Sequence, residues 1–96
     1  MASSVRELRR LLDDFVDGAP FLAFWNSFME HMEEFEPEAE LSPAGQAAYD
    51  ALYDLVYMGA EDPVSAAERA DGVIGEDELR ERLRHVRLET AGGRVV

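Results

Sequence analysis

The sequence predicts an all-α protein, and more specifically a small antiparallel four-helix bundle. Apolar residues recur at spacings of three and four along most of the chain, which is the period of a helix, and no segment shows a convincing strand pattern. Capping signals divide these stripes into four main segments with short links, which favour antiparallel neighbours. The 96 residues, 47 % of them hydrophobic, are enough for one domain with one modest core.

The first two helices are expected at residues 4–17 and 20–35. Ser4, with Glu7 three positions later, forms a capping box, and Gly18 stands where the first helix should end. The second segment carries the widest apolar face. We therefore expect it at the centre of the core, through Phe21, Leu22, Phe24, Trp25, Phe28, Met29, Met32 and Phe35.

The third helix begins with the strongest boundary signal of the chain, Leu41-Ser42-Pro43, after a linker at residues 36–40. We expect it to run to Met58, with an apolar side made of Ala47, Ala48, Ala51, Leu52, Leu55 and Val56.

The last helix is expected at residues 76–88, after a short helical turn at residues 62–70. Its inward side chains should be Leu79, Leu83 and Val86. We expect residues 1–90 to form the single domain and residues 91–96 to form a flexible tail.

The composition excludes several classes of protein. There is no cysteine, so a disulfide framework, a zinc–thiolate site and a thiol nucleophile are all impossible. No apolar run approaches the roughly 20 residues that a membrane helix requires. Charges interrupt the apolar residues near the N-terminus, so no signal peptide is visible. We expect a cytoplasmic protein that contacts no membrane.

The net charge of −12 comes from 21 acidic and nine basic residues, and all nine bases are arginine. Residues 11–68 contain fourteen acids and no lysine or arginine, whereas the rest of the chain holds seven acids and the nine arginines. Such a field repels nucleic acid and attracts basic protein surfaces. The alternative interpretation is that an acidic surface only keeps a small domain soluble.

Carboxylates are densest at the end of the second helix, where residues 30–40 contain six of them. Like charges at helical spacings repel each other, so a sequence that retains them is expected to use them. The alternative is a solvated face. We predict that Lys and Arg of a partner protein contact Glu33, Glu34, Glu36, Glu38, Glu40, Asp50, Asp54, Glu61 and Asp62.

Three tyrosines of the third helix, Tyr49, Tyr53 and Tyr57, are expected to be exposed. They suit a partner face or a dimer face equally well, or are ordinary helix residues. We expect a monomer or a weak dimer.

The residues do not indicate catalysis. A carboxylate–metal site would have to pair Glu30 and Glu33 with Asp50 and Asp54, whose spacing fits such sites poorly. A glutamate–histidine motif of the di-iron type, a phosphate-binding glycine loop and a nucleophile–base pair are not found. We therefore expect a protein that is not an enzyme and that holds no cofactor or metal.

Residues 71–78 look like the second half of a calcium loop. Asp71 and Glu78 would take its fifth and twelfth positions, but Ala67 and Arg69 would stand at the first and third, where ligands are needed. The alternative interpretation is a turn before the last helix.

Five features between residues 8 and 88 occur in a recognisable order. They are Leu11-Leu12-Asp13-Asp14-Phe15-Val16-Asp17-Gly18 before the aromatic helix, Leu41-Ser42-Pro43, Leu52-Tyr53 to Val56, Asp62-Pro63, and Ile74-Gly75-Glu76-Asp77-Glu78-Leu79-Arg80. In this order the chain resembles the colicin D-type immunity proteins.

The resemblance implies an antiparallel helical bundle that binds a cognate bacterial toxin, typically a tRNA-cleaving ribonuclease, and occupies its basic phosphate-binding site. It assigns Asp54, Glu61 and Asp62 to the contact with the toxin. The chain departs from the family at residues 57–60, where more carboxylate and aromatic character is expected.

The sequence therefore predicts an immunity-like inhibitor that blocks the basic active site of a toxin nuclease. The alternative is a general acidic adaptor, or a nucleic-acid mimic that inhibits another basic protein. A third hypothesis is a carboxylate–metal hydrolase of nucleotides.

Overall fold

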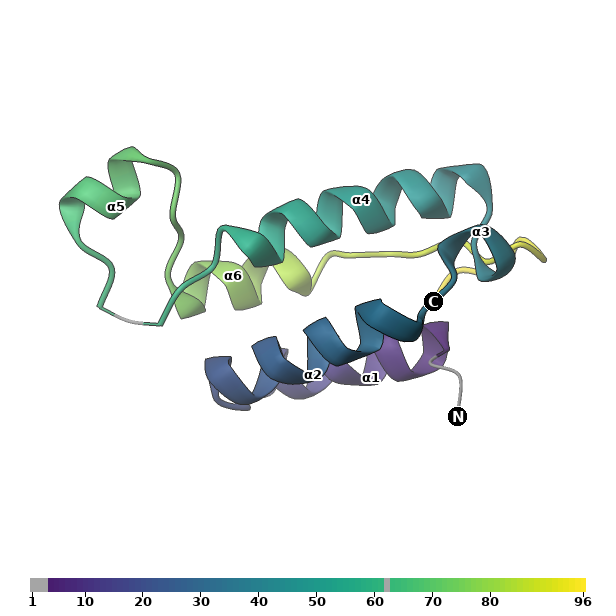
Figure 1. Ribbon diagram of the computed structural model, residues 1–96, viewed down its shortest axis with the longest axis horizontal. Coiled ribbons are helices and arrows are strands. Elements are labelled where there is room, and N and C mark those ends of the chain that lie inside the picture. Colours follow the sequence, from purple (N-terminus) through teal and green to yellow (C-terminus); the bar gives the residue numbers. More distant parts are fainter. Residues whose placement is uncertain (1–3, 62) are drawn as a thin grey trace.

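The computed structural model describes residues 4–61 and 63–96, whose regular elements are helices (Figure 1). The described residues contain no strand longer than an isolated β-bridge. The prediction of an all-α protein is confirmed. The helices are α1 (Val5–Val16), α2 (Phe21–Glu34), α3 (Pro37–Glu40), α4 (Pro43–Tyr57), α5 (Ala66–Ala70) and α6 (Glu76–Leu83).

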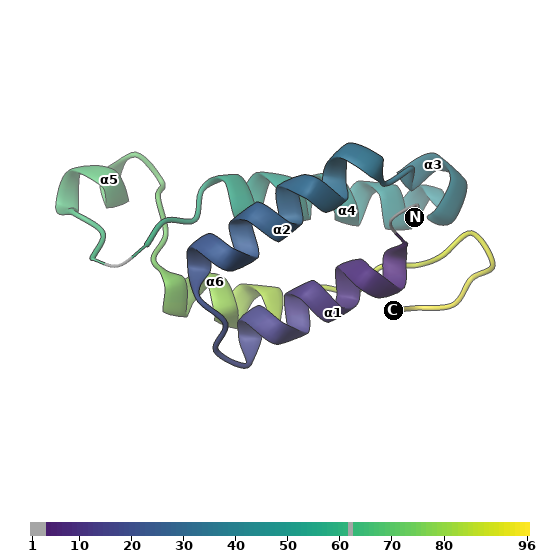
Figure 2. The same ribbon diagram turned by 60° about the horizontal axis from the view of Figure 1, so that its bottom comes forward.

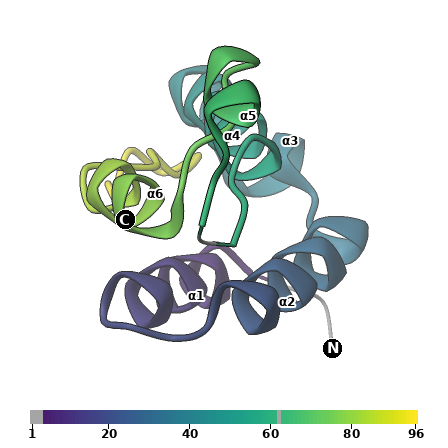
Figure 3. The ribbon, with the colours of Figure 1, turned by 90° about the vertical axis from the view of Figure 1, so that its left-hand side faces the viewer.

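The longer helices form two layers. Helices α1 and α2 pack side by side, α6 packs on α1, and α4 packs on α6 and α3. Viewed along the long axis, α1 and α2 lie below α4 and α6 (Figure 3), and α5 stands beyond the end of α4 (Figure 2). Successive long helices reverse direction (Figure 1), but a regular four-helix bundle is not confirmed, because α6 has only eight residues.

Two predicted helix starts are confirmed by hydrogen bonds. The Ser4 hydroxyl accepts a bond of 3.2 Å from the backbone N–H of Glu7, at the start of α1. The Ser42 hydroxyl accepts one of 3.1 Å from Gly45, and Pro43 occupies the first turn of α4. Each serine satisfies a backbone donor that has no partner within its helix.

Aromatic and leucine side chains of α1, α2, α4 and α6 form one core. The rings of Phe15 and Phe24 stack at 4.5 Å, and Phe21 meets Phe15 edge-on at 6.1 Å. The side chains of Leu8, Leu12, Leu52, Leu79 and Leu83 are almost fully buried around them. As predicted, the aromatic α2 contributes to the centre of this core through Phe21, Phe24 and Phe28, but Leu22, which was expected there, is 53 % exposed.

The buried face of α4 is rotated from the one expected. Tyr49, Leu52 and Val56 are buried, whereas Ala47 and Ala51 are exposed. Burial of a large ring and of branched side chains removes more apolar area from water than burial of alanine does. The same rotation places Gly45 against the carbonyl oxygen of Glu89, with no room there for a Cβ atom.

The expected linker at residues 36–40 contains the short helix α3. Its last residue, Glu40, accepts a hydrogen bond of 3.1 Å from the backbone N–H of Val5, the first residue of α1. This bond joins residues that are 35 positions apart in the sequence, so no local sequence pattern could predict it.

The last helix ends at Leu83, five residues earlier than predicted. A continuous helix would turn Leu88 about 180° away from Leu79, since nine residues at about 100° each separate them. Leu88 is fully buried in the structure, so the chain leaves the helix and continues extended.

Residues 91–96 were expected to be a flexible tail, but they fold back as part of a hairpin. The backbones of Leu88 and Val96 exchange two hydrogen bonds of 2.9 and 2.8 Å. Gly93 takes a positive φ of 86° in the turn, a conformation that glycine adopts without strain. The Gly92-Gly93 pair is a sequence signal for such a hairpin turn.

Arg80 of α6 connects the layer of α4 and α6 to the layer of α1 and α2. Its guanidinium donates hydrogen bonds to the carbonyl oxygens of Phe15, at 2.9 Å, and Ala19, at 3.1 Å. It also lies over the Phe15 ring, 4.6 Å from its centre. Arg80 therefore adds a second hydrogen bond to the Phe15 carbonyl at the end of α1, which also accepts from Gly18, and bonds the Ala19 carbonyl in the turn before α2.

Replacing Arg80 should lower stability much more than replacing a surface arginine of the same helix. We expect Arg80→Met to cost about 2–3 kcal/mol of unfolding free energy, because two charge-assisted bonds to backbone are lost. Arg82, whose side chain is 57 % exposed, makes only a surface ion pair with Glu78. Arg82→Met should cost less than about 0.5 kcal/mol. Urea denaturation of both variants measures the difference, and equal losses would contradict the role given to Arg80.

Candidate protein-binding surface

Most of the predicted binding carboxylates are on the surface. Glu33, Glu34, Glu36, Glu38, Asp50, Asp54 and Glu61 are exposed. Glu40 is half-buried and bonded to Val5, so its carboxylate has a structural role. Asp62 lies outside the described residues.

The structure brings part of this set around one hollow. A cavity of about 240 Å³ lies where the end of α2, the start of α3 and the middle of α4 meet. Asp50 lines it, and Glu36 and Glu38 flank Pro37, another lining residue. Asp54 lies one turn further along α4, and Glu61 follows the end of that helix, away from α3 (Figure 1). The carboxylates thus extend along α4 as expected, although Glu61 is separated from the α3 end by the length of the helix.

Most of these carboxylates form no ion pair with another described residue. Glu34 has a partner, whereas no ion pair is formed among the described residues by Glu33, Glu36, Glu38, Asp50, Asp54 or Glu61. The ion pairs formed between two described residues lie within α1 or between residues 76 and 85. The negative charge of Glu33, Glu36, Glu38, Asp50 and Asp54 is therefore not neutralised by ion pairs among the described residues.

Several arginines are held by backbone carbonyl groups elsewhere. Arg9 donates to the carbonyl of Val86 at 2.7 Å, and its side chain is 17 % exposed. Arg87 donates to the carbonyls of Arg84 and Val86. These bonds hold cations on the side of the molecule formed by α1 and the chain after α6.

Some of the unpaired carboxylates oppose the dipoles of their helices. Glu33 lies in the last turn of α2, and Asp54 lies in the last turn of α4. Acids at the C-terminal end of a helix face the negative end of its dipole, which costs about 0.3–1 kcal/mol each at low salt. A face that is only solvated does not require acids at the C-terminal ends of its helices. Their placement there therefore favours a role in binding a partner.

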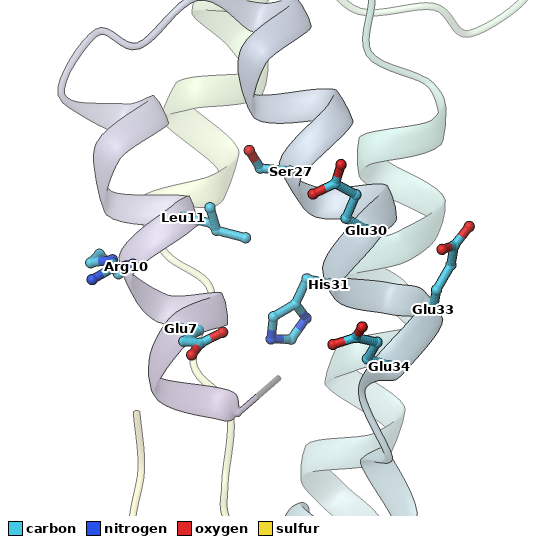
Figure 4. A pocket seen from close by; sticks show the side chains of 8 residues that line it. All are labelled: Glu7, Arg10, Leu11, Ser27, Glu30, His31, Glu33 and Glu34. Atoms are coloured by element: carbon cyan, nitrogen blue, oxygen red, sulfur yellow. The ribbon is translucent and has the colours of Figure 1, made fainter. Parts of the chain in front are cut away.

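A second hollow, of about 290 Å³, was not expected from the sequence. It lies between α1 and α2 and is lined by Glu7, Arg10, Leu11, Ser27, Glu30, His31, Glu33 and Glu34 (Figure 4). Glu7 and Glu34 point toward the His31 ring from opposite helices, whereas Arg10 and Glu33 point away from it.

His31 is only 4 % exposed and has one hydrogen bond, of 2.7 Å, between Nε2 and the carbonyl oxygen of Ser4. Because a carbonyl can only accept, Nε2 carries a proton. Nδ1 is buried without a partner among the described atoms. No carboxylate is bonded to the ring, so the arrangement that orients a catalytic histidine is not formed here. The hydrogen bond anchors the start of α1 to α2.

The metal hypotheses find no support in the described residues, where no group of three or more His, Asp or Glu side chains could hold a metal ion. In the calcium-like segment, Ile74 exchanges backbone bonds of 2.9 Å with Met58 and 3.0 Å with Ala60. Gly72 has a positive φ of 93° in the turn before it. These bonds support the interpretation of this segment as a turn.

Comparison with known proteins assigns no relative. The chain matches no family model, and no curated protein and no solved structure shows significant similarity to it. No helix in the described ranges has the length and apolar character that a membrane span requires.

Neutralising the carboxylates of α4 should stabilise the protein. We expect Asp50→Asn/Asp54→Asn to raise the unfolding free energy by about 0.5–1 kcal/mol at low salt, because repulsion within the pair and with the helix dipole is removed. Asp77→Asn is the control, since Asp77 lies in the first turn of α6 and pairs with Arg80. That variant should be destabilised. Urea denaturation at low and high NaCl measures both, and a loss of stability in the α4 variant would contradict the prediction.

The stability of the protein should fall at alkaline pH because of Tyr49. Burial raises the pKa of its phenol, and the charge of Asp50 raises it further. The fold therefore favours the neutral phenol, and stability is lost as pH rises above the unfolded pKa of about 10. Relative to Tyr49→Phe, the wild type should lose unfolding free energy above that pH. Urea denaturation at several pH values tests this, and a pH-independent difference would contradict it.

Proposed function

We propose that this protein is a non-catalytic inhibitor that binds a basic nuclease domain and covers the site where nucleic acid phosphates bind. Its partner would be the cognate toxin nuclease of the cell that makes it, as the resemblance to colicin D-type immunity proteins implies. In this proposal the protein acts in the cytoplasm, as a monomer or a weak dimer. The observation that carries the proposal is that Glu36, Glu38, Asp50 and Asp54 are exposed and form no ion pair with another described residue.

The proposal follows from the chemistry of nuclease surfaces. A nuclease binds phosphates through Arg and Lys side chains, and the same groups form charge-assisted hydrogen bonds with carboxylates. Glu36, Glu38, Asp50 and Asp54 are exposed, and none of them forms an ion pair with a described residue that a partner would have to displace. The net charge of −12 would also accelerate the encounter with a basic domain.

The partner can be identified by capture and then tested for nuclease activity. The immobilised protein is incubated with lysate of the source organism at about 50 mM NaCl, and bound proteins are released at about 500 mM, where exposed charge pairs are largely screened. We expect a single basic protein, which is purified and assayed for tRNA cleavage with and without one equivalent of this chain. Loss of cleavage at equal stoichiometry supports the proposal. A captured protein without nuclease activity would replace it with the acidic adaptor, and a nuclease that remains active would refute it.

Charge reversal on α4 should weaken that complex selectively. Asp50→Lys/Asp54→Lys should reduce affinity for the captured nuclease by about 100-fold or more if these pairs are desolvated on binding. The control Asp14→Lys/Asp17→Lys makes the same change of net charge on exposed residues at the end of α1. It should reduce affinity by less than about tenfold, through long-range attraction alone. Equal losses in the two variants would show that α4 is not at the interface.

A further inference from the structure

Aromatic side chains lie among the carboxylates of α4. Asp50, Tyr53, Asp54 and Tyr57 occupy one side of the helix, at spacings of three and four, and we call them the tyrosine–aspartate stripe. Tyr57 is 63 % exposed, and its ring lies 6.2 Å from that of the half-buried Tyr53. The third tyrosine, Tyr49, is buried against Phe35, which corrects the expectation that all three are exposed.

The apolar part of this surface continues onto α2. The Trp25 ring lies 6.4 Å from Tyr57, and Leu22, one turn before Trp25, is 53 % exposed. A purely solvated acidic face does not require aromatic rings between its charges. Tyrosine and tryptophan beside polar groups are typical of protein interfaces.

Arg80 shows how an arginine side chain is bound within this fold. Arg80 lies over the ring of Phe15, at 4.6 Å, and donates to nearby oxygen atoms. No arginine of the described residues lies over Tyr53 or Tyr57, and neither Asp50 nor Asp54 is ion-paired there. The stripe thus offers rings and carboxylates to a cation from outside.

The hollow beside the stripe suits the stem of such a cation. It is lined by Met32, Phe35, Pro37 and the two tyrosines Tyr49 and Tyr53, with Asp50 contributing a carboxylate. A long basic side chain can lay its methylene groups on apolar surface of this kind while its charged end reaches a carboxylate.

We propose that the tyrosine–aspartate stripe and this hollow bind arginine, in preference to lysine, on the surface of a basic protein. The inference rests on the proposed function and deepens it by naming the residue type that the partner presents. A guanidinium is planar, stacks on an aromatic face and forms two parallel bonds with one carboxylate, whereas an ammonium is a strongly hydrated point charge. Rings alternating with carboxylates therefore discriminate between two cations that a bare acidic surface binds alike.

The test compares two defined probes, the peptides nona-arginine and nona-lysine, by calorimetric titration at about 100 mM NaCl. We expect the wild type to bind nona-arginine about fivefold more tightly or better, because each stacked guanidinium adds a favourable contact. Trp25, the only tryptophan, reports the location, since its emission should change when a ligand covers Tyr57. The variant Tyr53→Leu/Tyr57→Leu removes the rings and keeps the charges, so the preference should fall below about twofold while nona-lysine affinity is retained.

Two further variants keep the test decisive. Tyr57→Leu alone, at a side chain that is 63 % exposed, replaces the double variant if circular dichroism shows that the latter does not fold. Asp14→Asn/Asp17→Asn, on α1, has the same net charge as Asp50→Asn/Asp54→Asn and should weaken both peptides without changing the preference.

The outcomes separate this inference from the proposed function. If the wild type binds the two peptides equally, or if the preference survives removal of the rings, the inference is wrong and the acidic inhibitor remains. If neither peptide binds, the inference and the proposed function fail together.

Discussion

The segment from Pro20 to Glu61 contains no lysine or arginine, so its helices cannot be held together by ion pairs with one another. Apolar contacts must therefore overcome the mutual repulsion of their carboxylates. Phe35 of the α2 terminus packs edge-on against Tyr49 of α4 at 5.1 Å, and Trp25 meets Tyr57 near the other end of α4. These contacts let α2 and α4 carry exposed acids on their outer sides and remain packed.

The arginines have a different role on the other side of the molecule. Arg9 and Arg80 donate to carbonyl groups of distant segments, and the remaining ion pairs lie within α1 and around α6. These arginines thus connect α1 and the α1–α2 turn to the C-terminal part of the chain. The outcome is a molecule with a neutralised side and a strongly negative side, and this division supports a role in binding a basic protein.

Some features of the candidate site could be predicted from the sequence, and others could not. Exposure of Glu36, Asp50 and Asp54 was predicted, because charged residues at these positions lie outside the apolar stripes. The hydrogen bond of Glu40 to Val5 and the burial of His31 between α1 and α2 were missed. Both depend on segments about 30 residues apart, and helical periodicity carries no information about which faces meet.

The sequence by itself determined the helical class and the places where α1 and α4 begin, because capping and periodicity are local properties. It also determined that the negative charge lies in the middle of the chain. Only the tertiary structure decided which side of α4 is buried, where α6 ends and how residues 88–96 pair. Those outcomes depend on competition for a single core: burying Tyr49 and Leu88 there removes more apolar area from water than burying alanines or continuing a helix would.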